Sequence, residues 1–297
     1  MKVLSYKSKI GDKIVLCLGY FDAIHKGHSH LIKSAKSYAE SNGFSLATLV
    51  FTGGKNGRKD VFTLPERLSR ISRLGADYAI LKKLGVFFRM TSPERFLNDL
   101  FKNYDIAAIF TGSDFTYGKH AAGNAKTLCD ECEKRGVYYS AEPLLTYNGK
   151  KISSCAVRSA LAEGDTEKAQ FLLGSPYFMS GKVVKGRKIG RTIGFPTANF
   201  YLPRDKFPLK EGVYQTLSSP VGKVYNSITN VGTQPTVKGK RVVIETYIDG
   251  FSGDLYGKLL PVFFVKRLRD VEKFNDINEL KNQLESDIKT VRENSKI

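Results

Sequence analysis

Residues 186–199 read GRKIGRTIGFPTAN, and this stretch narrows the possibilities for the chain more than any other. Gly186, Gly190 and Gly194 recur every four residues, and Arg191 lies between the last two. Glycines allow a backbone to approach a bulky anion closely and to donate its N–H groups to that anion. The stretch therefore favours a loop that binds phosphate.

Thr197 and Asn199 end the stretch and are two residues apart, so on an extended chain their side chains point the same way. Neutral oxygens beside a phosphate-binding loop suit Mg²⁺, which prefers oxygen ligands shared with substrate phosphates. These residues predict an ATP–Mg²⁺ site. A glycine-rich hairpin, in which Thr and Asn make only turn hydrogen bonds, explains the same spacing.

Length and composition indicate a two-domain globular protein. The chain has 297 residues, 41% of them hydrophobic, which is enough for two cores. No apolar run approaches the length of a membrane span, the first 13 residues are polar, and four cysteines do not make a disulfide framework. We expect a cytoplasmic protein with no membrane partner. The sequence leaves its oligomeric state open.

The formal net charge of +18 admits partners that are nucleic acids, acidic membranes or small anions. The basic residues are spread along the chain and form no run of five or six. A diffuse positive field suits an enzyme that handles several phosphates, and we expect no nucleic-acid partner. A basic nucleic-acid-binding protein remains the alternative from another class, although an aromatic-rich RNA-binding signature is absent.

Residues 1–174 alternate between strand and helix patterns. Apolar runs at 14–22, 44–51, 77–81, 105–111 and 136–141 predict strands, and periodic segments at 28–41, 63–74 and 92–101 predict helices. This alternation predicts a Rossmann-like α/β domain with a parallel sheet. Two short helices, at 156–163 and 166–173, are expected to end at Gly164 and Gly174.

From residue 175 onward the pattern changes to short β-rich segments separated by glycine and proline. Such spacing predicts an antiparallel β-barrel or sandwich. A terminal helix follows, with a capping box at Asp276 and Glu279. We therefore expect two domains, 1–174 and 175–297.

His25 and His28 lie in GYFDAIHKGHSH, between the first strand and the first helix. Ligands bind at the carboxyl ends of parallel strands, and anions bind at helix N-termini. Gly27, between the two histidines, lets the backbone approach a phosphate. A metal site that includes His30, or a set of solvated surface histidines, explains the pattern less well.

The H-x-G-H pattern resembles the nucleotidylyltransferase superfamily. TGSDFTYGKHAAG at 111–123, ISSCAVR at 152–158 and GRKIGRTIGFPTANF resemble, in order and spacing, motifs of the bacterial bifunctional riboflavin kinase/FMN adenylyltransferase family. The resemblance continues through NVGTQPTV, IETYI, DLYG and RLRDVEKF, and covers nearly the whole chain. It implies a riboflavin kinase-like barrel in the second domain.

For the first domain, the resemblance implies that FMN attacks the α-phosphate of ATP to give FAD and pyrophosphate. His25 and His28 would stabilise the phosphates in the transition state. The other ATP- and phosphate-binding positions that it implies are Gly19, Phe21, Asp22, Gly27, Asp114, Ser153, Ser154 and Arg158. Ser154 is expected to cap the helix that follows it.

For the second domain, the resemblance implies transfer of the γ-phosphate of ATP to the terminal ribityl hydroxyl of riboflavin. Glu245, in IETYI, would be the general base. Thr197 and Asn199 would hold Mg²⁺ and the phosphates, and Arg269 would bind flavin or nucleotide. Gly186, Gly190 and Arg191 would complete the ATP-binding set.

The chain departs from the family pattern at three places. Ala23 and Cys155 replace a usual glycine and threonine, and FTGGKNGRKDVF at 51–62 replaces a Pro-His-Pro-like segment. The last change resembles a flexible basic loop. It leaves open whether the first domain is fully active or whether the chain keeps only the kinase. Cys129 and Cys132 form a lone C-x-x-C, which we interpret as incidental.

Overall fold

The computed structural model describes residues 1–53, 58–186, 189–236 and 239–294. The chain forms two compact units, Met1–Ala156 and Val157–Ile297. Helices α6 (Ser154–Glu163) and α7 (Thr166–Leu173) lie largely in the second unit, where α7 packs against two strands of the second sheet. The structural division between the two compact units, after Ala156, thus precedes the predicted domain boundary. That two separately active domains meet between residues 174 and 175 stays a prediction.

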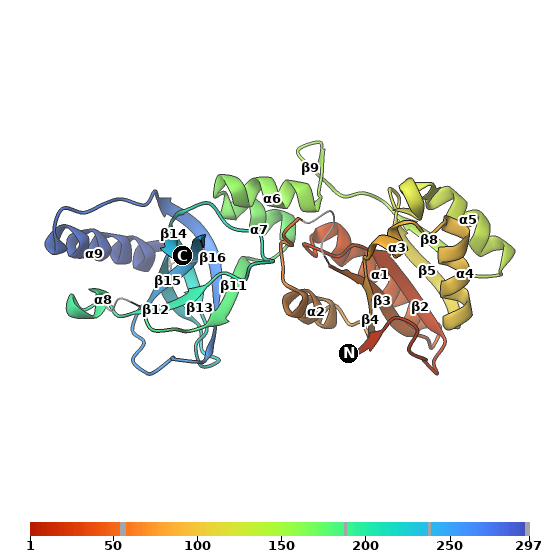
Figure 1. Ribbon diagram of the computed structural model, residues 1–297, viewed down its shortest axis with the longest axis horizontal. Coiled ribbons are helices and arrows are strands. Elements are labelled where there is room, and N and C mark those ends of the chain that lie inside the picture. Colours follow the sequence, from red (N-terminus) through yellow and green to blue (C-terminus); the bar gives the residue numbers. More distant parts are fainter. Residues whose placement is uncertain (54–57, 187–188, 237–238, 295–297) are drawn as a thin grey trace. The chain divides into compact units, whose positions relative to one another are not determined.

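The first unit is built on a six-stranded parallel sheet, which confirms the predicted α/β class (Figure 1). Its strand order is β1-β4-β3-β2-β5-β8. The bounds are β1 (Lys2–Ser5), β2 (Ile14–Gly19), β3 (Ser45–Thr52), β4 (Tyr78–Lys83), β5 (Ile106–Gly112) and β8 (Tyr138–Glu142). Strand β1, absent from the prediction, pairs with β4 at the edge of the sheet.

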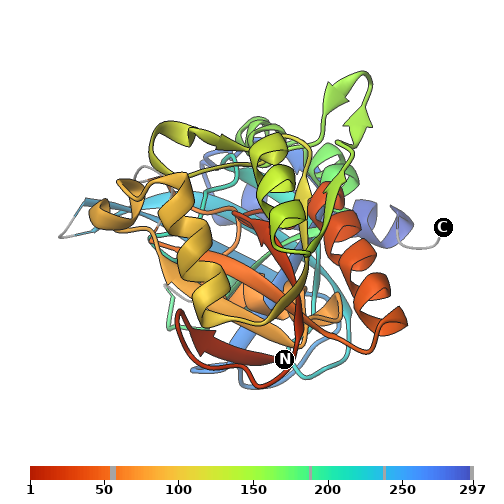
Figure 2. The ribbon, with the colours of Figure 1, turned by 90° about the vertical axis from the view of Figure 1, so that its right-hand side faces the viewer.

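Helices cover both faces of this sheet, because alternate residues of each strand point to opposite sides. One face packs against α1 (Lys26–Ser41) and α2 (Leu64–Arg73), and the other against α4 (Pro93–Asn103) and α5 (Ala125–Lys134). Figure 2 shows α1 and α4 on opposite sides of the sheet. The remaining elements are short: α3 (Val86–Arg89), a 3-10 helix (Lys119–Ala121), β6 (Thr116–Tyr117), β7 (Gly123–Asn124), β9 (Thr146–Tyr147) and β10 (Lys150–Lys151).

The strand order reverses at β2. The chain passes from β2 through α1 to β3 on one side, whereas β5 pairs with β2 on the other. Such a reversal opens a crevice at the carboxyl ends of the two strands, where open α/β sheets bind ligands. Residues that follow β2 and β5 are therefore brought to one place.

The second unit is a six-stranded antiparallel sheet that nearly closes into a barrel, as predicted, in the order β11-β16-β13-β14-β15-β12. Val184 donates its backbone N–H to the Asn199 carbonyl oxygen at 2.7 Å and so links the two edges. The bounds are β11 (Tyr177–Lys182), α8 (Ile189–Thr192), β12 (Thr197–Tyr201), β13 (Gly212–Ser218), β14 (Tyr225–Thr236), β15 (Gly239–Ile248), β16 (Leu259–Arg269) and α9 (Ile277–Asn294).

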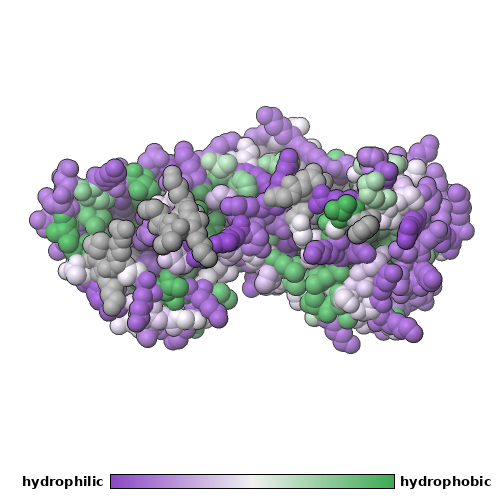
Figure 3. Space-filling view, viewed as in Figure 1, coloured by the Kyte–Doolittle hydropathy of each residue, from purple (hydrophilic) through white to green (hydrophobic). Residues whose placement is uncertain are grey.

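The two faces of this sheet differ. One is the barrel interior, which holds buried residues such as Phe200, Tyr214 and Phe264. The other face packs against α9 through Ile288 and Val291. In Figure 3 the visible faces of both units are mostly hydrophilic, with scattered apolar patches. In the part of the chain that the structure describes, no helix is long and apolar enough to cross a membrane.

Candidate active sites

His25 and His28 lie where α1 begins, at the carboxyl end of β2. His25 is the N-cap of α1, and its Nδ1 accepts a hydrogen bond from the His28 backbone N–H at 3.4 Å. The two imidazole rings stack with centroids 3.9 Å apart. A Cβ at Gly27 would lie only 3.2 Å from the His25 ring. Glycine therefore leaves space for this stacked pair.

Both histidines are neutral near pH 7. Burial lowers the pKa of His25 to about 4. Burial, and to a smaller extent the neighbouring His25, also lowers the pKa of His28 well below its ordinary value. Because His25 Nδ1 accepts a hydrogen bond, the proton of the neutral ring is on Nε2. The pair thus offers neutral N–H donors. His25 is 8% exposed, so the alternative of a solvated surface histidine is wrong for it.

The third histidine does not join this pair. His30 places Nε2 3.1 Å from Glu142 Oε2, and Ser34 and Ser140 both donate hydrogen bonds to the same carboxylate. These contacts tie α1 to the end of β8. They give His30 a role in holding the helix, rather than a place in a three-histidine metal site.

The backbone between β2 and α1 is strained. Phe21 and Ile24 have φ values of +50° and +45°, in the left-handed region that residues other than glycine seldom adopt. Each such residue costs about 1–3 kcal/mol unless the surroundings fix it, and such residues gather at functional sites. The strain sets the direction in which the chain enters α1.

Asp22, predicted to bind ATP, is buried and contacts protein backbone. Its Oδ1 accepts a hydrogen bond from the Val61 N–H at 2.7 Å. This bond fixes the end of the 51–62 segment, where Val61 and Phe62 are fully buried. The segment predicted as a flexible loop is therefore anchored at its end, and residues 54–57 within it lie outside the described part of the chain.

Arg67 on α2 supports the same turn and was missed from the sequence. It is 1% exposed, and its guanidinium donates hydrogen bonds to the carbonyl oxygens of Phe21, Tyr20 and Phe51 at 2.8–2.9 Å. The ends of β2 and β3 are thereby held together. The available signal was its position four residues before buried Ile71, on the inward stripe of the helix.

Asp114 follows β5, across the crevice from His25, and forms an ion pair with Lys151. Both charges act on the pKa of His25, so they lie near its ring. The topology thus gathers His25, His28 and Asp114 as predicted residues, and adds Lys151 from the hairpin strand β10. Nothing in the sequence pattern distinguished Lys151 from its many basic neighbours.

The start of α6 corrects one expectation. Ser153, rather than Ser154, caps this helix: Ser153 Oγ accepts the Ala156 N–H at 3.2 Å, and Ser154 is the first helical residue. Arg158 lies beyond the division between the units, with its guanidinium 5.8 Å from the centroid of the Phe207 ring. Its predicted contact with phosphate stays a prediction.

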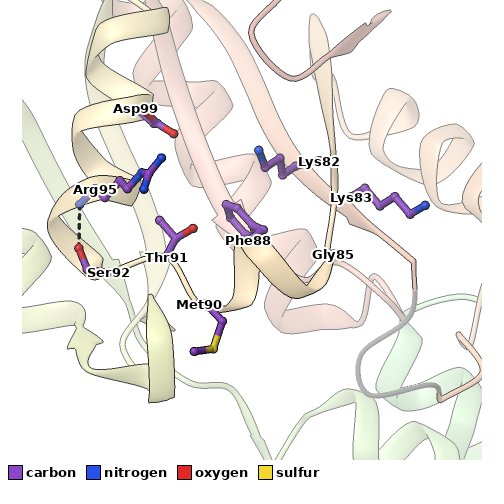
Figure 4. A pocket seen from close by; sticks show the side chains of 9 residues that line it. All are labelled: Lys82, Lys83, Gly85, Phe88, Met90, Thr91, Ser92, Arg95 and Asp99. Atoms are coloured by element: carbon purple, nitrogen blue, oxygen red, sulfur yellow. Dashed lines mark hydrogen bonds between the residues drawn. The ribbon is translucent and has the colours of Figure 1, made fainter.

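A pocket of about 730 Å³ lies in the first unit, at the carboxyl end of β4 (Figure 4). Lys82 and Phe88 point toward its centre, and the start of α4 forms the side of the pocket opposite Lys82. Phe88 also packs against Phe51 of β3, with ring centroids 5.8 Å apart. The lining residues are Lys82, Lys83, Gly85, Phe88, Met90, Thr91, Ser92, Arg95 and Asp99. None of them was predicted as a site residue.

A second constellation of predicted site residues, Thr197, Asn199 and Glu245, lies on the outer face of the barrel sheet, opposite its interior. Asn199 of β12 is paired in register with Glu245 of β15, and Thr197 with Tyr247. Thr197, Asn199 and Glu245 therefore project from one face. Asn199 Nδ2 lies 3.5 Å from Thr197 Oγ1, and Gln234 Nε2 donates to Glu245 Oε1 at 3.4 Å. The structure thus brings together three predicted residues from separate parts of the chain.

Asn199 is 6% exposed, and its Oδ1 is buried with no hydrogen-bond partner among the described residues. The glycine-rich segment covers it: a Cβ at Gly186 would overlap Asn199 Nδ2, and a Cβ at Gly190 would overlap the Phe195 carbonyl oxygen. Both positions require glycine for close packing. Arg191, on the short helix α8, is exposed.

Arg269, predicted to bind flavin or nucleotide, makes a two-pronged ion pair with Asp287 of α9. Its Nε lies 3.2 Å from both carboxylate oxygens and its Nη2 lies 2.9 Å from Oδ2. Asp287 is buried, so this pair joins α9 to β16. The predicted contact of Arg269 with a ligand remains untested by this geometry.

Family models match both parts of the chain. The model described as FAD synthetase matches residues 7–156, and the model described as riboflavin kinase matches residues 173–295. The first range contains the histidine pair with Asp114, and the second contains Asn199 with Glu245. Each constellation therefore falls within a separate family match.

Curated relatives and a solved structure cover nearly the whole chain. The bifunctional riboflavin kinase/FMN adenylyltransferase of Bacillus subtilis is 38% identical and covers 93% of this chain and 90% of the relative. Its namesake from Escherichia coli K12 is 32% identical, over 94% and 92%. A crystal structure titled macrolide-efflux protein, from Streptococcus pneumoniae, has a TM-score of 0.90 at 27% identity and covers 98% of both chains. The sequence motifs, the two family models and the curated relatives all indicate the same family. The chain belongs to the bifunctional riboflavin kinase/FMN adenylyltransferase family.

Proposed function

We propose that this chain makes FAD in two steps, each with its own ATP. Riboflavin is phosphorylated to FMN in the domain 175–297, and FMN is adenylylated to FAD with release of pyrophosphate in the domain 1–174. The observation that supports this most is the presence of two separate polar constellations, one in each family-matched region. We place both reactions in the cytoplasm.

In the kinase step, Glu245 accepts the proton of the terminal ribityl hydroxyl. The resulting oxygen attacks the γ-phosphorus of ATP, an O–P bond forms, the bond to the β,γ-bridging oxygen breaks, and ADP leaves. The position of Glu245 on a β-strand, with Gln234 hydrogen-bonded to its carboxylate, suits a fixed proton acceptor. The backbone N–H groups of Gly186 and Gly190 and the side chain of Arg191 contact the phosphates.

Thr197 and Asn199 fit a Mg²⁺ ion bound to ATP. The supporting observation is Asn199 Oδ1, a buried amide oxygen that has no donor among the described residues. The Nδ2 of the same side chain lies 3.5 Å from the Thr197 hydroxyl, so the two predicted ligands are neighbours. Neutral oxygens of this kind suit Mg²⁺. When bound, the ion neutralises charge on the phosphates of ATP.

In the adenylyltransferase step, a phosphate oxygen of FMN attacks the α-phosphorus of ATP. The bond to the α,β-bridging oxygen breaks, and pyrophosphate leaves. His25 and His28 donate hydrogen bonds to phosphate oxygens as charge develops, at the N-terminus of α1, where the backbone also favours anions. Asp114 positions Lys151 beside them. Ser153 and Ser154 supply further phosphate contacts.

We place the flavin of FMN in the pocket of Figure 4. FMN is an aromatic anion, and this pocket joins an aromatic ring, Phe88, to the cations Lys82 and Arg95. Phe88 packs against the end of β3, next to the strand that leads to the histidines. This assignment supplies the flavin contacts that the altered 51–62 segment left open.

Two assays on the purified chain test the proposal. With riboflavin, ATP and Mg²⁺ it should form FMN, and with FMN, ATP and Mg²⁺ it should form FAD and equimolar pyrophosphate. The altered segment 51–62 and Cys155 favour one alternative, a chain that keeps only the kinase. Phosphorylation of riboflavin without any pyrophosphate release from FMN and ATP would establish that alternative.

A further inference from the structure

Apart from Gln234, the motif NVGTQPTV takes no part in the chemistry assigned so far, yet its residues 230–236 run along β14 beside Glu245. Asn230, its first residue, is the register partner of Glu245 on the side away from Asn199. The three side chains Asn199, Glu245 and Asn230 therefore form a row across β12, β15 and β14 on one face. Glu245 is the middle member of that row.

Asn230 carries a second buried amide oxygen. Its Oδ1 has no hydrogen-bond partner in the described part of the chain, as is also true of Asn199 Oδ1. Its register neighbours on this face supply no side-chain donor: Glu245, when ionised, only accepts, and Val213 on β13 is apolar. A buried acceptor left unsatisfied costs about 1–3 kcal/mol, so an external donor is favoured there.

We propose that Asn230 binds a ribityl hydroxyl of riboflavin and so aligns the neighbouring terminal hydroxyl with Glu245. This inference rests on the proposed kinase reaction. A secondary hydroxyl of the polyol donates to Asn230 Oδ1, while the terminal hydroxyl donates to Glu245. Riboflavin thus spans two adjacent acceptors of the row. Gln234, from the same motif, holds Glu245 Oε1 and leaves the other carboxylate oxygen for the substrate.

The alternative that Asn230 is another Mg²⁺ ligand fits the row less well. Neighbouring strands are about 4.8 Å apart, so Asn230 and Asn199 begin about 10 Å apart with Glu245 between them. Adjacent oxygen ligands of one Mg²⁺ ion lie only about 3 Å from each other, given Mg–O distances near 2.1 Å. Asn199 therefore serves the nucleotide side of Glu245, and Asn230 serves the alcohol side.

The experiment compares Asn230→Ala with Asn278→Ala, a matched change at an exposed residue of α9. Quenching of riboflavin fluorescence, without ATP, gives the Kd, and kinase assays give KM for riboflavin and for Mg-ATP. Asn230→Ala should weaken riboflavin binding roughly ten-fold, as for one lost hydrogen bond, and leave the KM for Mg-ATP within two-fold. Asn278→Ala should match the wild type. Asn230→Ser, which retains an acceptor, should recover part of the loss.

A substrate analogue keeps the test independent of whether the variants fold. Riboflavin without the hydroxyl next to the terminal one should bind the wild-type chain roughly ten-fold more weakly, and Asn230→Ala should add no further loss. Unchanged riboflavin binding in Asn230→Ala, or a loss confined to Mg-ATP, overturns the assignment. Failure of the proposed kinase function is a different result, in which the wild-type chain does not phosphorylate riboflavin at all.

Discussion

Asn199 and Glu245 face each other directly across β12 and β15. Their backbones pair in register, so the amide predicted to hold nucleotide and the carboxylate predicted to accept a proton project side by side. A phosphoryl donor bound at one residue is thereby adjacent to an alcohol bound at the other. The antiparallel register, rather than either residue alone, creates the arrangement that the proposed kinase reaction needs.

Replacement of Glu245 by Gln should separate the two activities. The amide cannot accept the hydroxyl proton as the carboxylate does, so kcat for riboflavin should fall roughly 10²–10⁴-fold. Conversion of supplied FMN to FAD should continue at the wild-type rate. His28→Ala should show the reverse pattern. Equal loss of both activities in either variant would contradict separate sites.

The buried histidine pair should make stability depend on pH. His25 has a folded pKa of about 4, lowered from 6.5 by burial, so the unfolded chain binds a proton between those values while the folded chain does not. The contribution of His25 to the free energy of unfolding should therefore be fully present above pH 6.5. It should be lost as the pH falls from 6.5 toward 4. The effect of His25 alone is at most about 3 kcal/mol.

Urea unfolding of the full chain at several pH values checks this dependence, with a probe in the first unit. His25→Gln should flatten the profile between pH 4 and 6.5, because glutamine does not titrate. Its matched control is His120→Gln, a change at an exposed histidine. A profile as steep in His25→Gln as in the wild type would assign the effect to other groups.

Gly186→Ala should impair the kinase through Asn199. The added methyl group would overlap Asn199 Nδ2, so the side chain must leave its position beside Thr197. We expect the KM for Mg-ATP to rise about ten-fold or more, which corresponds to about 1.4 kcal/mol. Gly11→Ala is the control, because among the described residues none except its chain neighbours has an atom within 4 Å of the added Cβ. Similar kinetics in the two variants would show that Asn199 does not depend on this packing.

Phe88→Ala should weaken the use of FMN if the pocket of Figure 4 holds the flavin. Loss of one aromatic contact should raise the KM for FMN by about ten-fold, with the KM for ATP in the same reaction unchanged. Riboflavin phosphorylation is the internal control, since it belongs to the other unit. An unchanged KM for FMN would place the flavin elsewhere.

Periodicity and composition were enough to predict most of the elements that form the two folds, although β1 and the helix α5 were not predicted. The buried strands β2, β3 and β5 are continuous apolar runs, and α1 and α4 carry clear apolar stripes. Strand β1 was missed because KVLS is short and mostly exposed at a sheet edge. The cap at Ser153 was misplaced by one residue because two serines are adjacent, and only geometry distinguishes them.

The sites were harder to predict from the sequence than the fold, because they depend on contacts between distant segments. No local pattern indicates that Asn230 pairs with Glu245, since register depends on how whole strands align. Lys151 and Arg67 look like ordinary basic residues until the topology places one beside Asp114 and buries the other. The histidine pair was predictable because its residues are local, between a strand and a helix.

Arg269 and Asp287 allow a final prediction, which separates a structural role from ligand binding. They form an ion pair between β16 and α9 in which Asp287 is buried and Arg269 is partly exposed, so they should be coupled. Removal of Arg269 leaves the buried carboxylate of Asp287 without its cation and should cost up to about 3 kcal/mol of stability. Removal of Asp287 should cost less, because Glu272 lies 3.9 Å from Arg269. Removal of both by Arg269→Met with Asp287→Leu should cost less than the sum of the single changes. Chemical unfolding of the wild type, the two single variants and the double variant measures this coupling.

Riboflavin kinetics in the same four proteins then decide the role of Arg269. If Arg269 only holds α9, the double variant should recover stability and riboflavin affinity together. If it also contacts flavin or nucleotide, both proteins that lack Arg269 should keep a raised KM even where stability returns, whereas Asp287→Leu should keep a nearly normal KM in conditions where it is folded. The KM of the double variant thus distinguishes a residue that positions a helix from one that binds substrate.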